Sequence, residues 1–326
     1  MQWFPKKTLH RICRVLAWLI NLPPGRHQPT CTLFMKKNIQ SLLTAGLLRT
    51  LALMPYGLVA RLGELLGSLL YKLPSKRKRI LQTNLNLCFP EKSAEQKQAL
   101  AHSTFRHVIR SYLERGTQWY GSAPQIKRLV QLESAIELQD SYEQPTIFLG
   151  FHFAAIEATC MYYSIMHPVA SIYTPMSDSV TDTISRTQRA RFGTEMISRH
   201  GSAREILKVL KSGKPIMLAA DMDFGLRDSV FVPFFGVQAC TLTAVSRLAQ
   251  LSGARVVPFV AEVLPDYKGY KLNIFKPLDN FPSGDASADA LHMNQFLEER
   301  IRQTPDQYYW VHRRFKRRPE GEPSVY

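Results

Sequence analysis

The chain has 326 residues, a formal net charge of +16 at pH 7 and a hydrophobic residue content of 45%. This content excludes a disordered chain and suffices for one large folded core. The charge predicts an anionic partner, which could be nucleic acid, an anionic membrane, an acidic protein or a phosphorylated substrate, and does not choose among them.

The N-terminal part, residues 1–92, is expected to form a basic segment followed by membrane-associated helices. Residues 1–38 interleave lysine and arginine with aromatic side chains, a composition typical of the lipid headgroup region. Two apolar helical stretches follow at about 39–54 and 56–73, separated by Pro55. Charged residues interrupt them, so we expect helices that lie on the membrane or re-enter it. A buried hairpin of a soluble domain is the alternative.

Four consecutive positive charges, Lys76 to Arg79, follow the second apolar stretch. Beside a bilayer they would lie among anionic headgroups, each contributing about 1 kcal/mol of attraction. A solvated charged turn is the alternative. The apolar spacing of residues 80–89 is typical of an amphipathic helix that ends before Pro90.

The second predicted domain, residues 93–326, opens with a long helix over residues 93–120. Ser93 and Gln96 have the spacing of a capping box at its start. This helix also contains three arginines that are candidates for either the exposed surface or a ligand site: Arg106, Arg110 and Arg115.

From about residue 125 the chain alternates apolar strands with helices. Strands are predicted at 146–151, 169–173, 215–220, 255–263, 270–275 and 308–312, and helices at 154–166, 202–213, 242–251 and 286–303. Nearly continuous apolar strands between helices are typical of an α/β fold with both faces of the sheet covered. We therefore expect a mixed, mostly parallel sheet flanked by helices.

His152 follows the strand 146–151 directly, and Glu157 comes five residues later. Within one regular helix these side chains would point about 140° apart, because each residue turns the helix by about 100°. They can meet if His152 ends the strand and Glu157 lies in the first turn of the following helix. Glu157 could then accept the Nδ1–H of His152 and leave Nε2 free as a base. A purely structural pair is the alternative.

Asp221 and Asp223 end the apolar strand 215–220, where α/β sheets commonly place ligands. No histidine accompanies them, so we expect no metal. We expect them to orient a loop or an arginine, or to contact a substrate sugar. The five cysteines include no CxxC pair, which predicts free thiols without a zinc site or a disulfide framework.

Besides the His-x4-Glu arrangement, four ordered blocks resemble the late (secondary) acyltransferases of lipid A biosynthesis. This is the lauroyl/myristoyl transferase family, within the glycerolipid acyltransferase superfamily. The blocks are NLNLCFP at 84–90, DMDFG at 221–225, VFVPFFG at 230–236 and WVHRRFKRRP at 310–319. The likeness extends from about residue 55 to the C-terminus.

The resemblance implies a glycerolipid-acyltransferase-like fold and transfer of a fatty acyl chain from an acyl carrier protein thioester. The acceptor would be the 3-hydroxyl of an acyl chain on the phosphorylated, Kdo-bearing lipid A precursor. The enzyme would work at the cytoplasmic face of the inner membrane of a Gram-negative bacterium, without a cofactor, a metal or an acyl-enzyme. His152 would take the hydroxyl proton, with Glu157 orienting it. Arg189, or else Arg191, would stabilise the oxyanion, although either could be an ordinary solvated arginine.

The basic tail residues Arg313, Arg314 and Lys316 are expected to contact the phosphates of this acceptor or the acidic carrier protein. A solvated tail is the alternative. No nucleic-acid recognition motif accompanies them, so no nucleic-acid partner is expected. Two other functions remain open at this point: a glycerophospholipid acyltransferase with the same His and Glu, and a non-enzymatic basic protein that binds membranes or nucleic acid.

Overall fold

The computed structural model describes residues 31–176 and 179–326 of the chain. The chain divides into two compact units, residues 1–42 and 43–326, and the second unit contains the sheet. Helix α2 (Cys31–Ala52) continues from the first unit into the second. Most of the predicted basic segment, residues 1–38, lies outside the described residues, and the predicted domain boundary after residue 92 stays a prediction.

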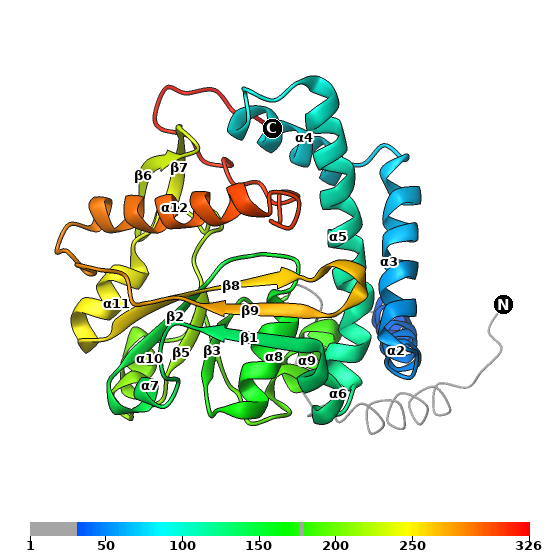
Figure 1. Cartoon of the computed structure of the whole chain (residues 1–326), viewed down its shortest axis with the longest axis horizontal. Helices are drawn as coiled ribbons and strands as arrows, with labels where there is room; N and C mark the ends of the chain where they lie inside the picture. Colours follow the sequence, from blue (N-terminus) through cyan, green and yellow to red (C-terminus); the bar gives the residue numbers. More distant parts are fainter. Residues whose placement is uncertain (1–30, 177–178) are drawn as a thin grey trace. The chain divides into compact units, whose positions relative to one another are not determined.

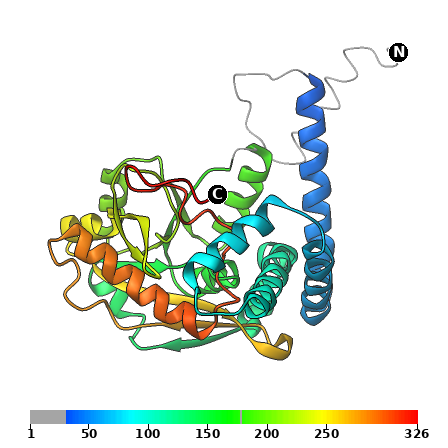
Figure 2. The same cartoon turned by 90° about the horizontal axis from the view of Figure 1, so that it is seen from above.

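Helix α3 (Tyr56–Tyr71) begins after Pro55 and packs closely against the long helix α5 (Ala94–Tyr120), as both views show (Figures 1 and 2). Two glycines make this approach possible. A Cβ at Gly63 would lie 2.6 Å from the Cα of Arg110, and one at Gly67 would lie 2.7 Å from the Cα of Arg106. Within the described part of the chain, no helix has the length and apolar character needed to span a membrane.

The run of four positive charges forms the first turn of α4 (Lys76–Cys88) and is not a separate loop. Ser75 caps this helix, because its Oγ accepts a hydrogen bond from the backbone N of Lys78 at 3.1 Å. The predicted capping box of Ser93 and Gln96 is confirmed at the start of α5.

Arg106 and Arg110 of α5 face α3 and both pair with Glu64. The Arg110–Glu64 distance is 2.8 Å, and Arg110 is almost fully buried. Of the three arginines predicted on this helix, these two therefore bind α3 to α5.

The seven-stranded sheet has the order β1-β9-β8-β2-β5-β3-β4. Its strands are β1 (Val130–Ser134), β2 (Thr146–Gly150), β3 (Ala170–Tyr173), β4 (Glu195–Ser198), β5 (Ile216–Ala219), β8 (Arg255–Val263) and β9 (Tyr270–Ile274). Neighbouring strands are parallel except β8 and β9, which are antiparallel. A separate antiparallel hairpin consists of β6 (Ser229–Phe234) and β7 (Val237–Leu242). The predicted mixed, mostly parallel sheet is confirmed.

Helices cover both faces of this sheet. The remaining helices are α6 (Ala123–Leu129), α7 (Asp140–Glu143), α8 (Ile156–Met166), α9 (Ser179–Ala190), α10 (Ala203–Lys211), α11 (Ala244–Ser252), the 3₁₀ turn η1 (Pro265–Tyr267) and α12 (Ala286–Gln303). Alternate side chains of the central strand β2 enter different cores. Ile147 and Leu149 pack in a core with α4, α10, α11 and α12, whereas Phe148 packs in a core with α3 and α8. Figure 1 shows α12 beside the β6–β7 hairpin.

The predicted last strand, residues 308–312, is wrong. Tyr308 forms only an isolated bridge with Phe153, after which the chain runs as an irregular segment. Buried side chains nevertheless hold the segment firmly, since Trp310 and Val311 have almost no exposed surface. The apolar character that predicted a strand here comes from packing against the core.

Candidate active site

His152 and Asp221 lie just beyond the carboxyl ends of two neighbouring parallel strands, β2 and β5. Parallel strands end at the same edge of a sheet, so these two residues meet although 69 positions separate them. His152 Nδ1 lies 2.6 Å from Asp221 Oδ1, and the backbone N of His152 donates to Asp221 Oδ2 at 2.9 Å. Both carboxylate oxygens therefore hold the same histidine.

The Asp221 side chain is buried, and its residue is only 3% exposed. Burial acts to raise the pKa of Asp221, but the charge and hydrogen bonds of His152 outweigh it and hold the pKa below its usual value. Asp221 is thus ionised and can only accept hydrogen bonds. His152 Nδ1 must then carry the proton in either charge state, and in the neutral imidazole this leaves Nε2 as a hydrogen-bond acceptor and a base.

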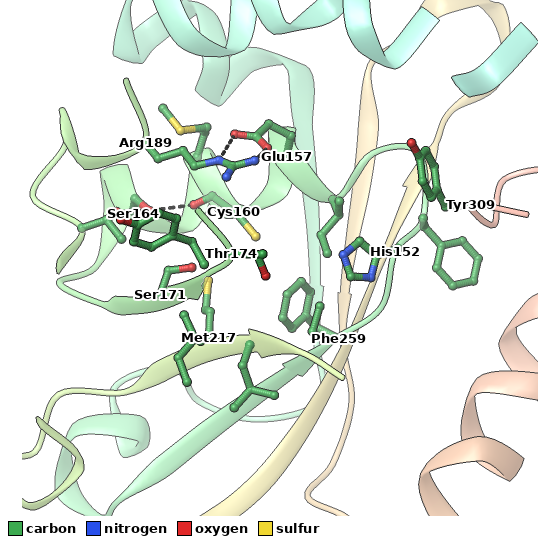
Figure 3. Close-up of a pocket in the computed structure, with 18 of the residues that line it drawn as sticks. His152, Glu157, Cys160, Ser164, Ser171, Thr174, Arg189, Met217, Phe259 and Tyr309 are labelled. Atoms are coloured by element: carbon green, nitrogen blue, oxygen red, sulfur yellow. Dashed lines mark hydrogen bonds and ion pairs between the residues drawn. The ribbon is translucent and has the colours of Figure 1, made fainter. Parts of the chain in front are cut away.

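The prediction that Glu157 accepts a hydrogen bond from His152 is wrong. Glu157 lies in the first turn of α8 as expected, but its carboxylate accepts from Trp119 Nε1 at 2.7 Å and pairs with Arg189 at 2.5 and 2.8 Å. Figure 3 shows the Glu157–Arg189 pair across the cavity from His152. The reason is the bend at residues 152–155, because α8 begins only at Ile156.

Glu157 is ionised at neutral pH. Burial acts to raise its pKa, but Arg189, with help from Arg115 and the Trp119 hydrogen bond, lowers the pKa to about 2. The carboxylate thereby connects α5, α8 and α9 around the cavity. These contacts assign Glu157 to the cavity wall and away from the imidazole.

Arg189, the first candidate for the oxyanion, lines the cavity, with its guanidinium held by Glu157. Arg191, the second candidate, does not line it. Its guanidinium donates to the backbone carbonyls of Gln118 at 3.2 Å and Gly121 at 2.5 Å. The structure therefore places Arg189 at the cavity and gives Arg191 a packing role.

Asp223 holds the C-terminal segment beside the site. Its carboxylate accepts from the backbone N of Arg317 at 2.8 Å and pairs with the Arg317 guanidinium at 2.5 Å. Its backbone N donates to His312 Nε2 at 3.2 Å. Burial, together with the nearby charge of His152, lowers the pKa of His312 to about 4, so this ring is a neutral acceptor. Of the roles considered for Asp223, the structure shows contact with an arginine and a loop.

Asn84 connects two of the sequence blocks to the site. Its fully buried side chain donates to the backbone carbonyls of Trp310 and His312, both at 2.7 Å. The same segment reaches the histidine, because the backbone N of Tyr309 donates to the His152 carbonyl at 2.9 Å. Sequence reasoning noticed both blocks but did not connect them.

The prediction that Arg314 contacts a phosphate or a carrier protein is wrong. Arg314 is 1% exposed and donates to the Cys240 carbonyl at 2.7 Å, Thr241 Oγ1 at 2.9 Å and Asn294 Oδ1 at 3.2 Å. Buried guanidinium groups need such partners, so Arg314 holds the β6–β7 hairpin and α12 together. The predicted contacts of Arg313 and Lys316 stay predictions.

A cavity of about 440 Å³ opens beside His152. Figure 3 shows His152 and Tyr309 on one side of it and Met217 and Phe259 below. The apolar lining includes Phe153, Met161, Met196, Met217, Leu218 and Phe259. Polar and charged side chains, among them Arg115, Glu157 and Arg189, complete the lining. A cavity of this size that combines apolar walls with placed polar groups is typical of a ligand site. Because its residues come from distant elements, sequence reasoning missed it.

Cys160 also lines this cavity. Burial, together with the neighbouring Glu157 charge, raises the pKa of the thiol to about 12, so it is not a thiolate nucleophile. Over the described ranges, no three His, Cys, Asp or Glu side chains gather to form a metal site.

The sequence profile described as bacterial lipid A biosynthesis acyltransferase matches residues 26–317. The chain belongs to this family. It is 36% identical to the lipid A biosynthesis lauroyltransferase of Escherichia coli K12, over 87% of this chain and 94% of the relative. It is 31% identical to the palmitoleoyltransferase of the same organism, over 84% of this chain and 90% of that one. The resemblance predicted from the sequence blocks is confirmed, and the chain is an acyltransferase of lipid A biosynthesis.

Among solved structures, the 1-acyl-sn-glycerophosphate acyltransferase PlsC from Thermotoga maritima aligns with 76% of this chain and 98% of its own. The TM-score is 0.35 and the sequence identity is 13%.

Proposed function

We propose that this acyltransferase moves a fatty acyl group from an acyl carrier protein thioester to the 3-hydroxyl of an acyl chain on the Kdo-bearing lipid A precursor. Family membership supports acyl transfer in lipid A biosynthesis. The observation that carries the mechanism is the pairing of His152 with the buried Asp221 at the side of the cavity.

In the proposed reaction, His152 Nε2 takes the proton of the acceptor hydroxyl as its oxygen attacks the thioester carbonyl. The new C–O bond forms, and the carbonyl oxygen takes up the negative charge. Ionised Asp221 stabilises the imidazolium through its bond to Nδ1. When the C–S bond breaks, the imidazolium returns the proton to the departing thiolate. No acyl-enzyme forms, and Asp221 takes the role that the sequence assigned to Glu157.

The apolar cavity would hold the acyl chain of the donor. Met196, Met217 and Phe259 line this cavity. The positions of Met217 and Phe259 relative to His152 suit an acyl chain whose thioester lies beside the imidazole (Figure 3). The Glu157–Arg189 pair would support the opposite wall. Its charges are compensated within the protein, so a neutral chain can pass them at low electrostatic cost.

The outer face of α3 supports a location on the inner membrane, at its cytoplasmic side. Leucines cover this face, and Leu65, Leu69 and Leu73 are 59%, 52% and 56% exposed. The exposed leucines of α3, together with Leu73 just after its end, are Leu58, Leu62, Leu65, Leu66, Leu69 and Leu73, and we call them the leucine face. Soluble monomers rarely expose a continuous apolar surface, whereas a helix lying in the lipid interface requires one.

The test is acyl transfer by the purified protein in detergent micelles, followed by mass spectrometry of the acceptor. We expect one added acyl chain on the lipid A precursor and none on lysophosphatidate. His152→Ala should abolish transfer in a folded protein, whereas His200→Ala, an exposed histidine outside the cavity, should keep the wild-type rate.

Transfer onto lysophosphatidate alone would assign the protein to glycerophospholipid synthesis. A wild-type rate in His152→Ala would refute the mechanism, and absence of transfer onto both acceptors would support a non-enzymatic protein. Mass spectrometry of lipid A from cells with and without the protein would give the added chain and its position.

A further inference from the structure

Arg115 is a positively charged residue of the cavity lining, and among the described residues no carboxylate lies within ion-pair distance of it. It lines the cavity together with His152 and Tyr309. The other lining arginine, Arg189, is paired with Glu157. Arg115 instead lies over aromatic rings, with its guanidinium carbon 4.6 Å from the ring centre of Tyr112. A half-buried guanidinium that lies over aromatic rings and pairs with no carboxylate still has N–H groups to offer to an anion.

Arg77 of α4 approaches the same place from another element. Its Nη1 donates to the Val311 carbonyl at 2.9 Å, two residues beyond Tyr309. Across the described ranges, no carboxylate lies within ion-pair distance of Arg77 either. Arg79, two positions further along the helix, is exposed and makes no such contact with the 308–312 segment.

Two tyrosine hydroxyls belong to the same region as these arginines. The Tyr112 and Tyr309 oxygens are 2.7 Å apart and share one hydrogen bond. In such a pair one hydroxyl donates to the other, so the second O–H remains available to a ligand. Burial, together with Tyr112, raises the pKa of Tyr309, while the charges of Arg77 and Arg115 act in the opposite direction. Both guanidinium groups are therefore close enough to influence the same hydroxyl, which stays protonated.

We propose that Arg77, Arg115 and the Tyr112–Tyr309 hydroxyl pair bind a phosphate monoester on the sugar of the acceptor glycolipid. The inference rests on the proposed function and adds a subsite to it. A phosphate oxygen can accept from each guanidinium and from the free hydroxyl, and such charge-assisted bonds are strong. Arg115 lies over the Tyr112 ring, and Arg77 donates to the segment that carries Tyr309, so the donors come from separate helices to one hydroxyl pair. This arrangement favours a compact anion over the surface of an acidic protein.

The position of this subsite gives it a role in the reaction. Tyr309 is bonded through its backbone to His152, so an anion held at its hydroxyl lies on the same side of the cavity as the base. The subsite would fix the sugar headgroup while the acceptor hydroxyl meets Nε2. It would thereby contribute both to affinity and to the choice of a phosphorylated acceptor.

The test compares two acceptors, the phosphorylated lipid A precursor and the same glycolipid after phosphatase treatment. The readout is the ratio of the two kcat/KM values. We expect Arg115→Gln and Arg77→Gln each to lower this ratio about 10- to 100-fold, the effect of one lost charge-assisted hydrogen bond. Arg115→Lys should restore part of it. Arg79→Gln, with the same charge change on the same helix, should keep the wild-type ratio.

A merely structural role would lower both kcat/KM values and leave their ratio unchanged, so an unchanged ratio in both glutamine variants overturns the proposal. A rise in KM for the acyl carrier protein with an unchanged ratio would assign the arginines to the donor and overturn it as well. If the wild type transfers nothing, the proposed function fails, but the subsite is still tested by calorimetric binding of the phosphorylated glycolipid in micelles. There, affinity equal to wild type in Arg115→Gln would overturn it.

Discussion

Asp221→Asn tests the central geometry of the site, because it changes one atom and almost no volume. The asparagine oxygen can still accept from the backbone N of His152, as Asp221 Oδ2 does at 2.9 Å. Its NH₂ group then faces His152 Nδ1 at the position of Oδ1, 2.6 Å away. An amide NH₂ only donates, so Nδ1 must accept and the imidazole proton must move to Nε2. Nε2 then cannot take the proton of an acceptor hydroxyl.

The expected loss is large because nothing else in the site can replace the carboxylate. Both Asp221 oxygens contact His152, and the residue is 3% exposed, so water cannot restore the tautomer. The corresponding substitution in the Ser-His-Asp triad of serine proteases lowers kcat about 10⁴-fold for the same reason. We expect a loss of kcat of about 10³- to 10⁴-fold here, equivalent to about 4–5.5 kcal/mol in the activation barrier.

The assay is single-turnover transfer from acyl carrier protein to the lipid A precursor, with product measured by mass spectrometry. Urea unfolding of the same sample checks that the variant is folded. Glu157→Gln is the matched comparison, because it makes the same carboxylate-to-amide change across the cavity, and we expect a much smaller loss of kcat. A folded Asp221→Asn variant with kcat within tenfold of wild type would refute the tautomer argument.

Four further outcomes follow from the same structure. Glu157→Gln should lower the free energy of unfolding by about 3 kcal/mol in urea titrations, because Arg189 loses its carboxylate. The Glu157 pKa near 2 means that wild-type stability falls as pH drops from about 4.5 towards 2, and an equal slope in Glu157→Gln would contradict this. Because the pKa of His312 is near 4 in the folded protein, the unfolded chain binds this proton at higher pH than the folded chain does. The free energy of unfolding should therefore also fall between about pH 6.5 and 4. His312→Asn should reduce this pH dependence in unfolding measurements. The pair Leu65→Glu and Leu69→Glu should weaken binding to anionic vesicles at least about tenfold in co-sedimentation, whereas unchanged binding would exclude the leucine face as the membrane contact.

The central strands could be predicted from the sequence because they are buried on both sides. Residues 146–151, 215–220 and 255–263 are nearly continuous apolar runs, and β2, β5 and β8 lie at those positions in the middle of the sheet. The edge strands carry no such signal. In β1, four of the five residues are exposed, and only Val130 and Leu132 are apolar, so the strand has no continuous apolar run. The edge strands β1 and β4 and the β6–β7 hairpin were not predicted from the sequence.

The sequence by itself also determined the family and the histidine, because ordered blocks and a strand followed by His152 are local features. Only the tertiary structure decided which carboxylate serves that histidine. Glu157 is five residues away, but the bend at 152–155 carries it to Arg189. Asp221 is 69 residues away, but β5 lies next to β2 in the sheet, and parallel strands bring their ends together.

The same distinction applies to the positive charge. A basic tail suggests an exposed surface, yet Arg314 lies in the core, where three oxygens satisfy its guanidinium. Arg77 and Arg115 belong to two different helices; Arg115 lies over the Tyr112 ring, and Arg77 donates to the Val311 carbonyl, two residues after Tyr309. The sequence determines how many charges the chain has, but burial and the packing of helices against one another decide which of them remain available to a substrate.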